Sequence, residues 1–494
     1  MTTPTNTTEA SSQSSETELV TNGRQPHVNN EVLSVSVGRS LWTMAWPVVA
    51  LNLLQVANSL IDRFFIGNLP DTSMSAHGAS MSFMFLLFSL AYSIAVGAGA
   101  IVARAYGAKE ISEYRLAAQQ SLQVAMYVGI GLSVLAVVLT PFAARLIFQP
   151  NYTEEIRQLT LFLGAYSLGV PAICIVQVLA ASLRSTGDTK SPMYLSGFQI
   201  LLHMMLNFLF IFPPRNNIPG LGLGLTGAGF ALSGSAWCSA ILYTIYVRRT
   251  TLGVKFSLRF PRKDWIVRIL KIAIPSGVQA ALRTFSLTAF TVVLGIVPNH
   301  EAAIAAMGIG FAIESLMFAQ AFGVSAAVGA LVGQNLGAKE PLRAEKIGWL
   351  GGAVAFGIST VISFPVFLYV PAIAPVLAGH KPEVAAEVVS IVRWLCVSEP
   401  LFCLSMVIIG GMQGAGDTKR PLWIGLVSLW GLRLPIAVVL SLGTGSVIFS
   451  GIQLPFGYAM GAIGAWIAMS FTQGVQGFLA AWAWKQGKWK TMKV

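Results

Sequence analysis

Twelve long apolar runs follow one another along this chain and constrain its fold more than any other feature. A helix needs about 20 mostly apolar residues to cross a bilayer. The predicted spans are 40–66, 74–104, 115–143, 155–183, 190–212, 222–247, 266–297, 302–333, 344–372, 384–411, 420–443 and 457–484. Only 11% of the 494 residues are charged, whereas roughly one quarter is typical of soluble proteins. We therefore predict an all-α polytopic membrane protein.

The net charge of +12 follows a membrane topology and does not indicate a nucleic-acid surface. Of the 32 lysine and arginine residues, 24 fall on the side that holds both ends of the chain and the connections from even-numbered to odd-numbered spans. Because cytoplasmic loops of membrane proteins are enriched in these residues, both termini are predicted to be cytoplasmic. The expected location is the plasma membrane, which in a bacterium is the inner membrane.

Two motifs occur twice at nearly the same spacing. The segments "LRSTGDTKSPM" and "MQGAGDTKRPL" share Gly-Asp-Thr-Lys, which begins at Gly187 and again at Gly416, an offset of 229. The segments "ARAYGAKE" and "GQNLGAKE" end at Glu110 and Glu340, an offset of 230. Repeats at a constant offset indicate a duplicated structural unit.

A third pair, Pro47 and Pro275, has an offset of 228 and extends the duplication over most of the chain. Each copy holds six predicted helices, an even number, so both copies enter the membrane in the same direction. Such halves are related by an axis along the membrane normal. The predicted fold is therefore 12 transmembrane helices in two six-helix lobes related by a pseudo-twofold axis. Asp188 and Asp417 of the repeated motif are expected to order a turn through backbone hydrogen bonds.

The predicted domains follow from this duplication. They are a disordered cytoplasmic tail (1–38), an N-terminal lobe (39–247), a basic cytoplasmic inter-lobe connection (248–265), a C-terminal lobe (266–485) and a cytoplasmic tail (486–494). The tail 1–38 is rich in Ser, Thr, Asn and Glu and has no apolar signal segment. All four cysteines lie within predicted spans without metal-ligand spacing, so neither a disulfide framework nor a metal site is predicted.

The first span carries an unusual polar stripe. Asn52, Gln55, Asn58 and Asp62 are three, three and four residues apart and share one helical face. An ionisable residue in the hydrocarbon costs at least ~2.5–3.5 kcal/mol on insertion scales, so it normally faces protein or water and marks a pathway. The alternatives are a structural charge that pairs with Arg63 and, for the amides, hydrogen bonds to neighbouring helices.

The repeated Gly-Asp-Thr-Lys-x-Pro, together with "LVGQNLGAKEPLRAEK" and the ending "WKQGKWK", resembles the multidrug and toxic compound extrusion (MATE) family. The similarity runs from about Ser40 to Lys490. This resemblance implies two six-helix lobes and alternating access. It also implies export of amphipathic, often cationic compounds against an inward flow of protons or sodium, with no cofactor besides that gradient.

The resemblance also assigns roles to the first helix. The segment "LIDRFFIG" places Asp62 where the family carries a cation-coupling acid late in this helix. Pro47 matches the family's bending point, a conformational role. The residues predicted to line the substrate cavity are Gln55, Asn58, Gln177 and Ser233.

The fifth helix departs from the family pattern Asn-x-x-x-Asp-Pro. His203, Asn207 and Phe208 take those three positions, so the second carboxylate is missing. Sodium prefers several oxygen ligands, whereas a neutral histidine offers nitrogen, and the change favours proton over sodium coupling. We predict cation coupling by Asp62, His203 and Asn207; a packing role for His203 is the alternative. By helical rise, contact with Asp62 requires a tilt or kink.

The C-terminal lobe carries its own intramembrane charges. Arg283 stands where some relatives carry a glutamate, and it is the repeat counterpart of Gln55. The others are Glu314, Glu399 and Arg433. Two cations and two anions suggest structural compensation, with ion coupling as the alternative.

Three functional classes remain open on the sequence alone. The leading prediction is multidrug efflux by proton antiport, with small molecules as substrates, membrane lipids as surroundings, a monomeric state and no nucleic-acid partner. The second is a flippase for lipid-linked glycans, which would line its cavity with several cations. The third, an intramembrane enzyme, would need convergent nucleophile, base or metal ligands, and the chain has only five histidines.

Overall fold

The computed structural model describes residues 36–214, 220–448 and 451–494, and these are almost entirely helical. Nearly all of the predicted tail 1–38 lies outside the described residues. The first half holds α3 (Val37–Ile66), α4 (Asp71–Gly107), α5 (Ile111–Ile147), α6 (Thr153–Ser167), α7 (Val170–Ser185), α8 (Lys190–Ile211) and α9 (Gly224–Arg248). The second holds α10 (Lys263–Leu294), α11 (His300–Gly337), α12 (Pro341–Leu377), α13 (Pro382–Gly414), α14 (Lys419–Gly425), η1 (Leu426–Arg433), α15 (Leu434–Ser441), strands β1 (Val447–Ile448) and β2 (Ile452–Gln453), α16 (Ala462–Lys485) and η2 (Lys488–Thr491).

The helices account for the twelve predicted spans. Within the described residues, ten helical segments are long and apolar enough to cross a membrane, and α6 with α7 adds an eleventh as a bent pair. The twelfth, α16, is 24 residues long, and its glutamines Gln473 and Gln476 make it more polar. Helices satisfy all their backbone hydrogen bonds internally, as a segment in lipid must.

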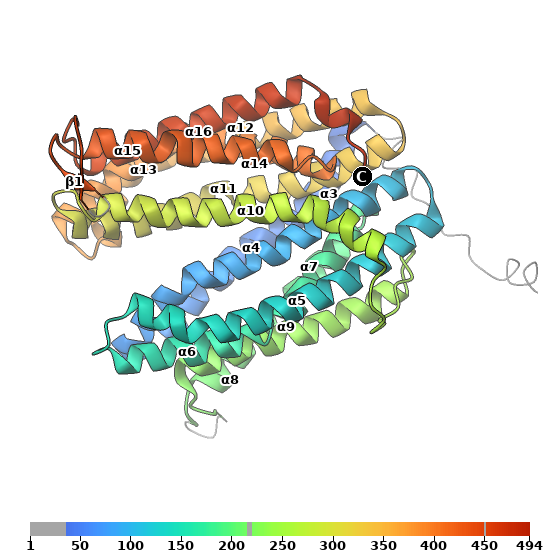
Figure 1. The fold of residues 1–494 in the computed structure, drawn as a ribbon, viewed down its shortest axis with the longest axis horizontal. Coiled ribbons are helices and arrows are strands. Elements are labelled where there is room, and N and C mark those ends of the chain that lie inside the picture. The colour runs from blue at the N-terminus through green and yellow to red at the C-terminus, as the bar shows by residue number, and fades with distance from the viewer. Residues whose placement is uncertain (1–35, 215–219, 449–450) are drawn as a thin grey trace, which may run out of the picture.

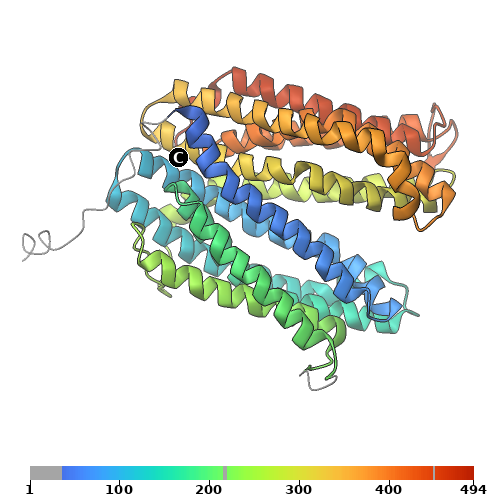
Figure 2. The same cartoon turned by 180° about the vertical axis from the view of Figure 1, so that it is seen from behind.

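The helices form two lobes that lie side by side (Figure 1). In Figure 1, α4 to α9 fill the lower lobe and α10 to α16 the upper one. The first helix of each half crosses the seam. α3 packs against α8 of its own lobe and α11 of the other, whereas α10 packs against α4 of the other lobe. Seen from behind, α3 runs diagonally between the lobes (Figure 2).

A reciprocal contact between α4 and α11 closes one end of the seam. A Cβ atom added to Gly107 would lie 1.9 Å from the carbonyl oxygen of Gln334, and one added to Gly337 would lie 2.0 Å from that of Arg104. The residues of each equivalent pair differ by 230, the spacing of the sequence repeat. The two backbones therefore touch in a twofold arrangement that only glycine permits.

A second reciprocal contact joins the first helix of each lobe to the second helix of the other. A Cβ on Gly277 of α10 would lie 3.2 Å from the Ser93 hydroxyl of α4. A Cβ on Gly323 of α11 would lie 2.6 Å from the Val49 nitrogen of α3. Positions 49 and 277 differ by 228, and positions 93 and 323 differ by 230. The predicted pseudo-twofold relation between the lobes is confirmed by these matching contacts.

The repeated Gly-Asp-Thr-Lys motif folds the same way in both halves. Gly187 and Gly416 have φ of 92° and 86°, a left-handed conformation that favours glycine. The Asp188 carboxylate accepts a hydrogen bond from the backbone nitrogen of Ser191 at 3.0 Å, and Asp417 accepts one from Arg420 at 3.3 Å. The prediction that these acids order a turn is confirmed.

The predicted span 155–183 is not one straight helix. It breaks between α6 and α7 with a bend of 43°. Gly169 lies at the break, where a Cβ would come within 2.8 Å of Ser233 on α9. Pro171, at the start of α7, has no backbone N–H to continue the hydrogen-bond ladder. Both residues explain the bend.

The predicted span 420–443 contains a second irregularity. Its centre, η1, is a π-helix, a form that occurs in short stretches and often near functional groups. Arg433 is its last residue and is buried. After α15, β1 and β2 pair antiparallel in a short hairpin.

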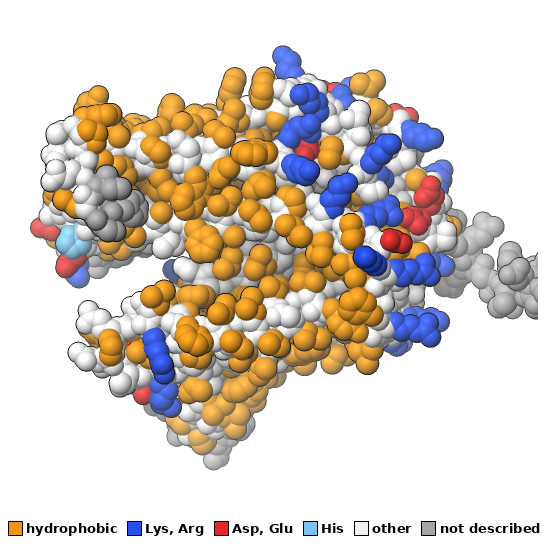
Figure 3. Space-filling model, viewed as in Figure 1, with side chains coloured by type: hydrophobic (Ala, Val, Ile, Leu, Met, Phe, Trp, Pro, Cys, Tyr) orange, Lys and Arg blue, Asp and Glu red, His pale blue; other side chains and the backbone are white. Residues whose placement is uncertain are grey.

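The molecular surface has an apolar girdle and two unlike ends (Figure 3). Large apolar side chains such as Val361, Phe64 and Phe142 are more than two thirds exposed, as expected of lipid-facing positions. On the face shown in Figure 3, lysine and arginine side chains gather at the end where α4 and α11 cross. At the other end, the surface is hollowed between the two lobes.

Candidate functional site

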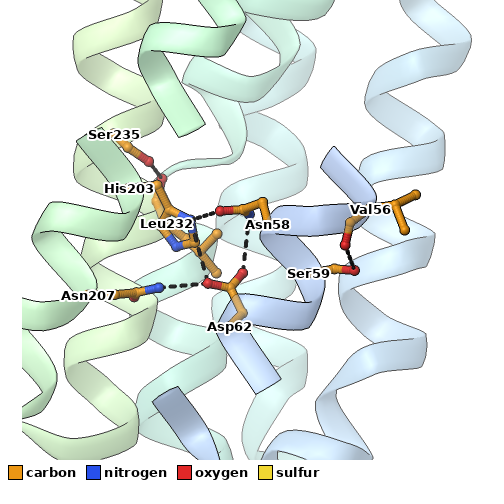
Figure 4. Close-up of polar contacts among 8 residues, drawn as sticks. All are labelled: Val56, Asn58, Ser59, Asp62, His203, Asn207, Leu232 and Ser235. Carbon is orange, nitrogen blue, oxygen red and sulfur yellow. Dashed lines mark hydrogen bonds and ion pairs between the residues drawn. The ribbon is translucent and has the colours of Figure 1, made fainter. Parts of the chain in front are cut away.

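The carboxylate of Asp62 lies between α3 and α8 (Figure 4). Its Oδ1 accepts a hydrogen bond from Asn207 Nδ2 at 2.7 Å, and its Oδ2 accepts one from Asn58 Nδ2 at 3.3 Å. The Asp62 side chain is 21% exposed, so it is only partly buried. The carboxylate is thus held by two neutral amide donors.

His203 completes the cluster from α8. Its Nδ1 lies 3.4 Å from Asn58 Oδ1 and 3.7 Å from Asp62 Oδ1. Both oxygens are acceptors, which assigns the ring proton to Nδ1. The opposite nitrogen, Nε2, and the Oδ1 atom of Asn207 are buried without a hydrogen-bond partner among the described residues.

The three residues predicted to couple a cation therefore meet in space. Asp62 lies four residues before the last residue of α3, and Asn207 lies four before the last residue of α8. Because the two helices end at the same side of the lobe, equal distances from their ends bring the side chains together. α3 runs unbroken through Pro47, so the contact needs no break at that residue. Whether Pro47 acts in a conformational change stays a prediction.

The other two residues of the polar stripe, Asn52 and Gln55, have different surroundings. Asn52 Nδ2 donates to the carbonyl of Ala319 on α11 at 3.3 Å, which links the lobes. Gln55 is exposed and bonds to nothing among the described residues, as a residue lining an open space would. Asn52 and Asn58 thus show the helix-binding role that was the alternative for the amides. Asn58 also belongs to the Asp62 cluster.

The other two predicted cavity residues have different surroundings. Gln177 on α7 is half-buried. Ser233 is buried, and its hydroxyl donates to the carbonyls of Ala165 and Tyr166 at 2.5 and 3.2 Å. A hydroxyl has one proton to donate, and the two carbonyls of the last turn of α6 share it. Ser233 on α9 therefore contacts the helix just before the α6–α7 bend.

Asp62 has no lysine or arginine partner among the residues that the structure describes. Within the part of the chain that the structure describes, no ion pair joins Asp62 to Arg63 or to any other lysine or arginine. The Arg63 side chain is exposed. The predicted alternative, an Asp62–Arg63 pair, is not found in this structure. Among the described residues, the groups that stabilise a charged Asp62 carboxylate are therefore its amide and imidazole neighbours.

The C-terminal lobe holds a second polar cluster, and it is deeply buried. Glu314 Oε1 on α11 accepts from Gln473 Nε2 on α16 at 2.8 Å, and Gln473 Oε1 accepts from the Ser398 hydroxyl on α13 at 2.5 Å. Glu399 is 0% exposed and accepts a weak hydrogen bond from the Cys403 thiol at 3.5 Å. Ser398 and Gln473 were not predicted; a glutamine in an apolar run was the available signal.

The two arginines of this lobe lie near those acids. Both Arg283 and Arg433 interact electrostatically with Glu314. Arg283 is half-buried, and its guanidinium carbon lies 5.5 Å from the ring centre of Phe402, a cation–π distance. Arg433 Nε donates to the Thr472 hydroxyl at 3.1 Å. Among the described residues, none of these four charges forms a direct ion pair, so compensation acts at longer range.

The groups that bond to the Asp62 carboxylate are N–H donors. Amide N–H groups point at the carboxylate, whereas a sodium ion would need oxygen atoms there. Across residues 36–214, 220–448 and 451–494, no group of three or more His, Cys, Asp or Glu side chains could hold a metal ion.

Comparison with known proteins gives the same two halves. The MatE family model matches this chain twice, over residues 47–209 and 275–439, which together are more than half of it. A relative from Thermotoga maritima named probable multidrug resistance protein NorM is 25% identical over 463 residues, covering 93% of this chain and 94% of the relative. Multidrug resistance protein MdtK of Photorhabdus laumondii is 25% identical over 411 residues, covering 82% and 88%.

Solved structures of similar fold agree over nearly the full length. One is an outward-facing multidrug resistance MATE family transporter of the MOP superfamily, with a TM-score of 0.82, 18% identity, and 94% of this chain and 98% of that chain covered. Another is a MOP superfamily transporter from Pyrococcus furiosus whose binding pocket is described as reversed in polarity. It has a TM-score of 0.84 and 18% identity, with 95% and 100% covered. At this identity the likeness shows the fold.

Proposed function

The chain belongs to the MatE family of transporters, which are not enzymes, and from that premise we propose that it exports amphipathic organic compounds, cations among them, by antiport with protons. The observation that carries the proposal is the Asp62 cluster. It holds one partly exposed carboxylate, two amide donors and an imidazole, and no lysine or arginine ion pair within the described residues. Such a carboxylate changes its net charge when it takes up or releases a proton.

The donors around Asp62 support protons over sodium. Asn207 and Asn58 both direct their N–H groups at the carboxylate, and the family pattern that this helix resembles has an asparagine where His203 stands and an aspartate where Asn207 stands. A proton bound at Asp62 changes the strength of these bonds, because hydrogen bonds to an ionised acceptor are stronger than neutral ones. Proton uptake and release would then bias the lobe between two arrangements.

The shape of the molecule supports alternating access. The seam is closed where α4 and α11 touch, and it is hollowed at the other end (Figure 3). By the distribution of lysine and arginine, we assign the closed end to the cytoplasm and the hollow to the outside. Both termini and the connection between α9 and α10 would then be cytoplasmic. The protein would act in the inner membrane as a monomer.

This orientation has a direct test. Single cysteines placed in the connection between α9 and α10 should resist a membrane-impermeant thiol reagent in intact cells, and should react once the membrane is permeabilised. The exposed Leu258 is a suitable position. The native Cys238 is also exposed and is replaced by serine in the background protein. Rapid labelling of Leu258→Cys in intact cells would reverse the proposed topology.

The flippase alternative receives less support. A cavity for lipid-linked glycans would be lined by several cations, and the candidates were Arg283 and Arg433. Arg433 is 4% exposed and bonds to Thr472 inside the lobe, so it does not line an open cavity. Only the half-buried Arg283 of this pair remains as a candidate.

Proteoliposomes separate the coupling ions. A fluorescent organic cation is offered to the purified protein under an imposed pH gradient, a sodium gradient, or both. We expect the pH gradient alone to drive accumulation of the dye, and sodium to add nothing. Accumulation that requires sodium would contradict proton coupling, and a dye that neither gradient moves would contradict multidrug export.

A further inference from the structure

The hydrogen bonds from α3 to α8 at the Asp62 cluster form a chain with a direction. His203 Nδ1–H donates to Asn58 Oδ1, and Asn58 Nδ2–H donates to Asp62 Oδ2. Asn58 therefore uses both ends of one amide, as acceptor toward α8 and as donor toward the carboxylate. An amide cannot reverse one end without reversing the other, because its oxygen and nitrogen exchange places together.

Proton uptake by Asp62 conflicts with this direction. Oδ1 already accepts from Asn207 Nδ2 at 2.7 Å and faces His203 Nδ1 at 3.7 Å, so Oδ2 is the oxygen with room for a proton. A proton on Oδ2 would face the Nδ2–H of Asn58, which is donor against donor. Rotating the Asn58 amide by a half turn exchanges its oxygen and nitrogen, so its oxygen accepts from the protonated Asp62. The Nδ2–H of Asn58 then faces the Nδ1–H of His203, and two donors oppose each other there. Moving the ring proton from Nδ1 to Nε2 removes the second conflict.

We propose that Asn58 and His203 form a relay in which proton uptake by Asp62 reverses the Asn58 amide and moves the imidazole proton of His203 from Nδ1 to Nε2. The inference rests on the proposed proton coupling at Asp62. It assigns Asn58 and His203 as positioning residues, because they transmit the protonation state of Asp62 from α3 to α8. Both states have equal numbers of hydrogen bonds along the chain.

The two states differ at the far end of the relay. His203 is 3% exposed, and its Nε2 has no partner among the described residues. Buried N–H donors lack a partner more rarely than buried acceptors do, so the Nε2–H form of His203 is the costlier of the two. The proton-loaded relay therefore strains the α8 side of the lobe. A rearrangement that gives Nε2–H an acceptor would relieve this strain, which is how proton binding favours a second arrangement.

Among the described residues, no charged group on the surrounding helices forms an ion pair with Asp62 or His203 other than the pair between these two. On α3 the next residue after Asp62, Arg63, is exposed and acts electrostatically on His77 of α4. His77 itself packs edge-on against Phe162. On α11, Glu314 is bound to Gln473. Among the described residues, no ion pair joins Asp62 to α4, α11 or α12, and His203 is the titratable group that faces it from α8.

Nitrogen NMR of histidine tests the relay without a transport assay, because the two neutral tautomers have different imidazole ¹⁵N shifts. The full-length protein, labelled with ¹⁵N-histidine, is reconstituted in lipid, and the His203 signal is identified by its loss in His203→Gln. We expect Nδ1–H at high pH and Nε2–H after Asp62 is protonated. In Asp62→Asn, an amide replaces the protonated acid, and we expect Nε2–H at every pH.

Two further variants make the result specific. Asn58→Leu should uncouple the tautomer of His203 from pH and reduce pH-driven export about tenfold, the effect of losing one hydrogen bond to a charged group. Asn52→Leu is the matched control, since Asn52 lies on the same stripe but bonds to α11, and it should leave the tautomer change intact. A His203 tautomer that stays constant in the wild-type protein while export still requires Asp62 would overturn the relay and leave proton antiport standing. Normal export by Asp62→Asn would instead remove the proposed function beneath it.

Discussion

The polar cluster around Asp62 holds one acid and no arginine, whereas the cluster around Glu314 and Glu399 holds two acids with two arginines nearby. Asp62 is 21% exposed, and the two glutamates are 6% and 0% exposed. The two halves of one duplicated fold therefore differ in their intramembrane charges: the N-terminal cluster is partly exposed and has no arginine partner among the described residues, and the C-terminal cluster is buried with arginines nearby. From this difference we expect the accessible acid without a counter-charge to exchange protons, and the buried, compensated set to have a structural role.

The largest difference between the lobes is expected from Asp62→Asn. This change removes the exchangeable proton and keeps the shape of the side chain. Export driven by a pH gradient should be abolished, while the thermal unfolding midpoint stays close to that of the wild type. The measurements are dye flux in proteoliposomes and unfolding in detergent. Export at the wild-type rate would place the coupling in the C-terminal lobe and reverse the comparison.

Removing the partner of the C-terminal acid should have the opposite signature. Gln473→Leu removes the hydrogen bond that Glu314 accepts, and it leaves the Ser398 hydroxyl with only the backbone carbonyls of Trp394 and Leu395 as acceptors. The free energy of unfolding should fall by about 3 kcal/mol, and the pH dependence of export should remain. Asn207→Leu is the matched change beside Asp62, and it should alter export more than stability. A loss of pH-driven export in Gln473→Leu would show that both lobes couple protons.

The symmetric crossing offers a test in which the lobes should behave alike. Gly107→Ala and Gly337→Ala each place a methyl group about 2 Å from a backbone oxygen, so the helices must separate. Both variants should lower the free energy of unfolding by about 1–3 kcal/mol, and by similar amounts. Gly131 has nothing within 4 Å, and Gly131→Ala serves as the control; it should be neutral or stabilising by up to about 1 kcal/mol. Clearly unequal effects would argue against a symmetric closure.

The smallest effect is expected from Ser233→Ala. The Ser233 hydroxyl bonds to the α6 carbonyls, so its loss should cost about 1 kcal/mol of stability and leave export of every dye unchanged. Export of a dye panel and a thermal unfolding curve provide the measurement. Altered dye selectivity would restore Ser233 to the substrate cavity and place that cavity closer to α6 than the contacts indicate.

Much of this fold could be predicted because its signals are repeated. Apolar runs determined the spans, and the offsets of 228 to 230 related Pro47 to Pro275 and Gly187 to Gly416. The meeting of Asp62 with His203 and Asn207 was also predicted. Helical rise alone suggested different depths, since sequence does not reveal that α3 and α8 end at the same side of the lobe.

The remaining features depend on contacts between segments distant in sequence. The bend between α6 and α7 was not predicted; Gly169 and Pro171 are its sequence signal, and its partner Ser233 lies on another helix. Nothing in the sequence marked the π-helix that ends at Arg433. The arginines and glutamates of the C-terminal lobe were expected as compensating charges. Their separation, without a direct ion pair among the described residues, depends on how α10, α11, α13 and α16 pack.

The contact of Gly107 with residue 334 and of Gly337 with residue 104 has the form of an isologous interface, in which one surface patch meets its own copy. Such a patch is what two separate, identical six-helix chains would need to form a closed dimer. The crossing therefore has the geometry of a twofold dimer interface held within one polypeptide. Because one polypeptide carries both halves, they need not be identical: the patch is symmetric, whereas the acids and arginines of the two lobes differ.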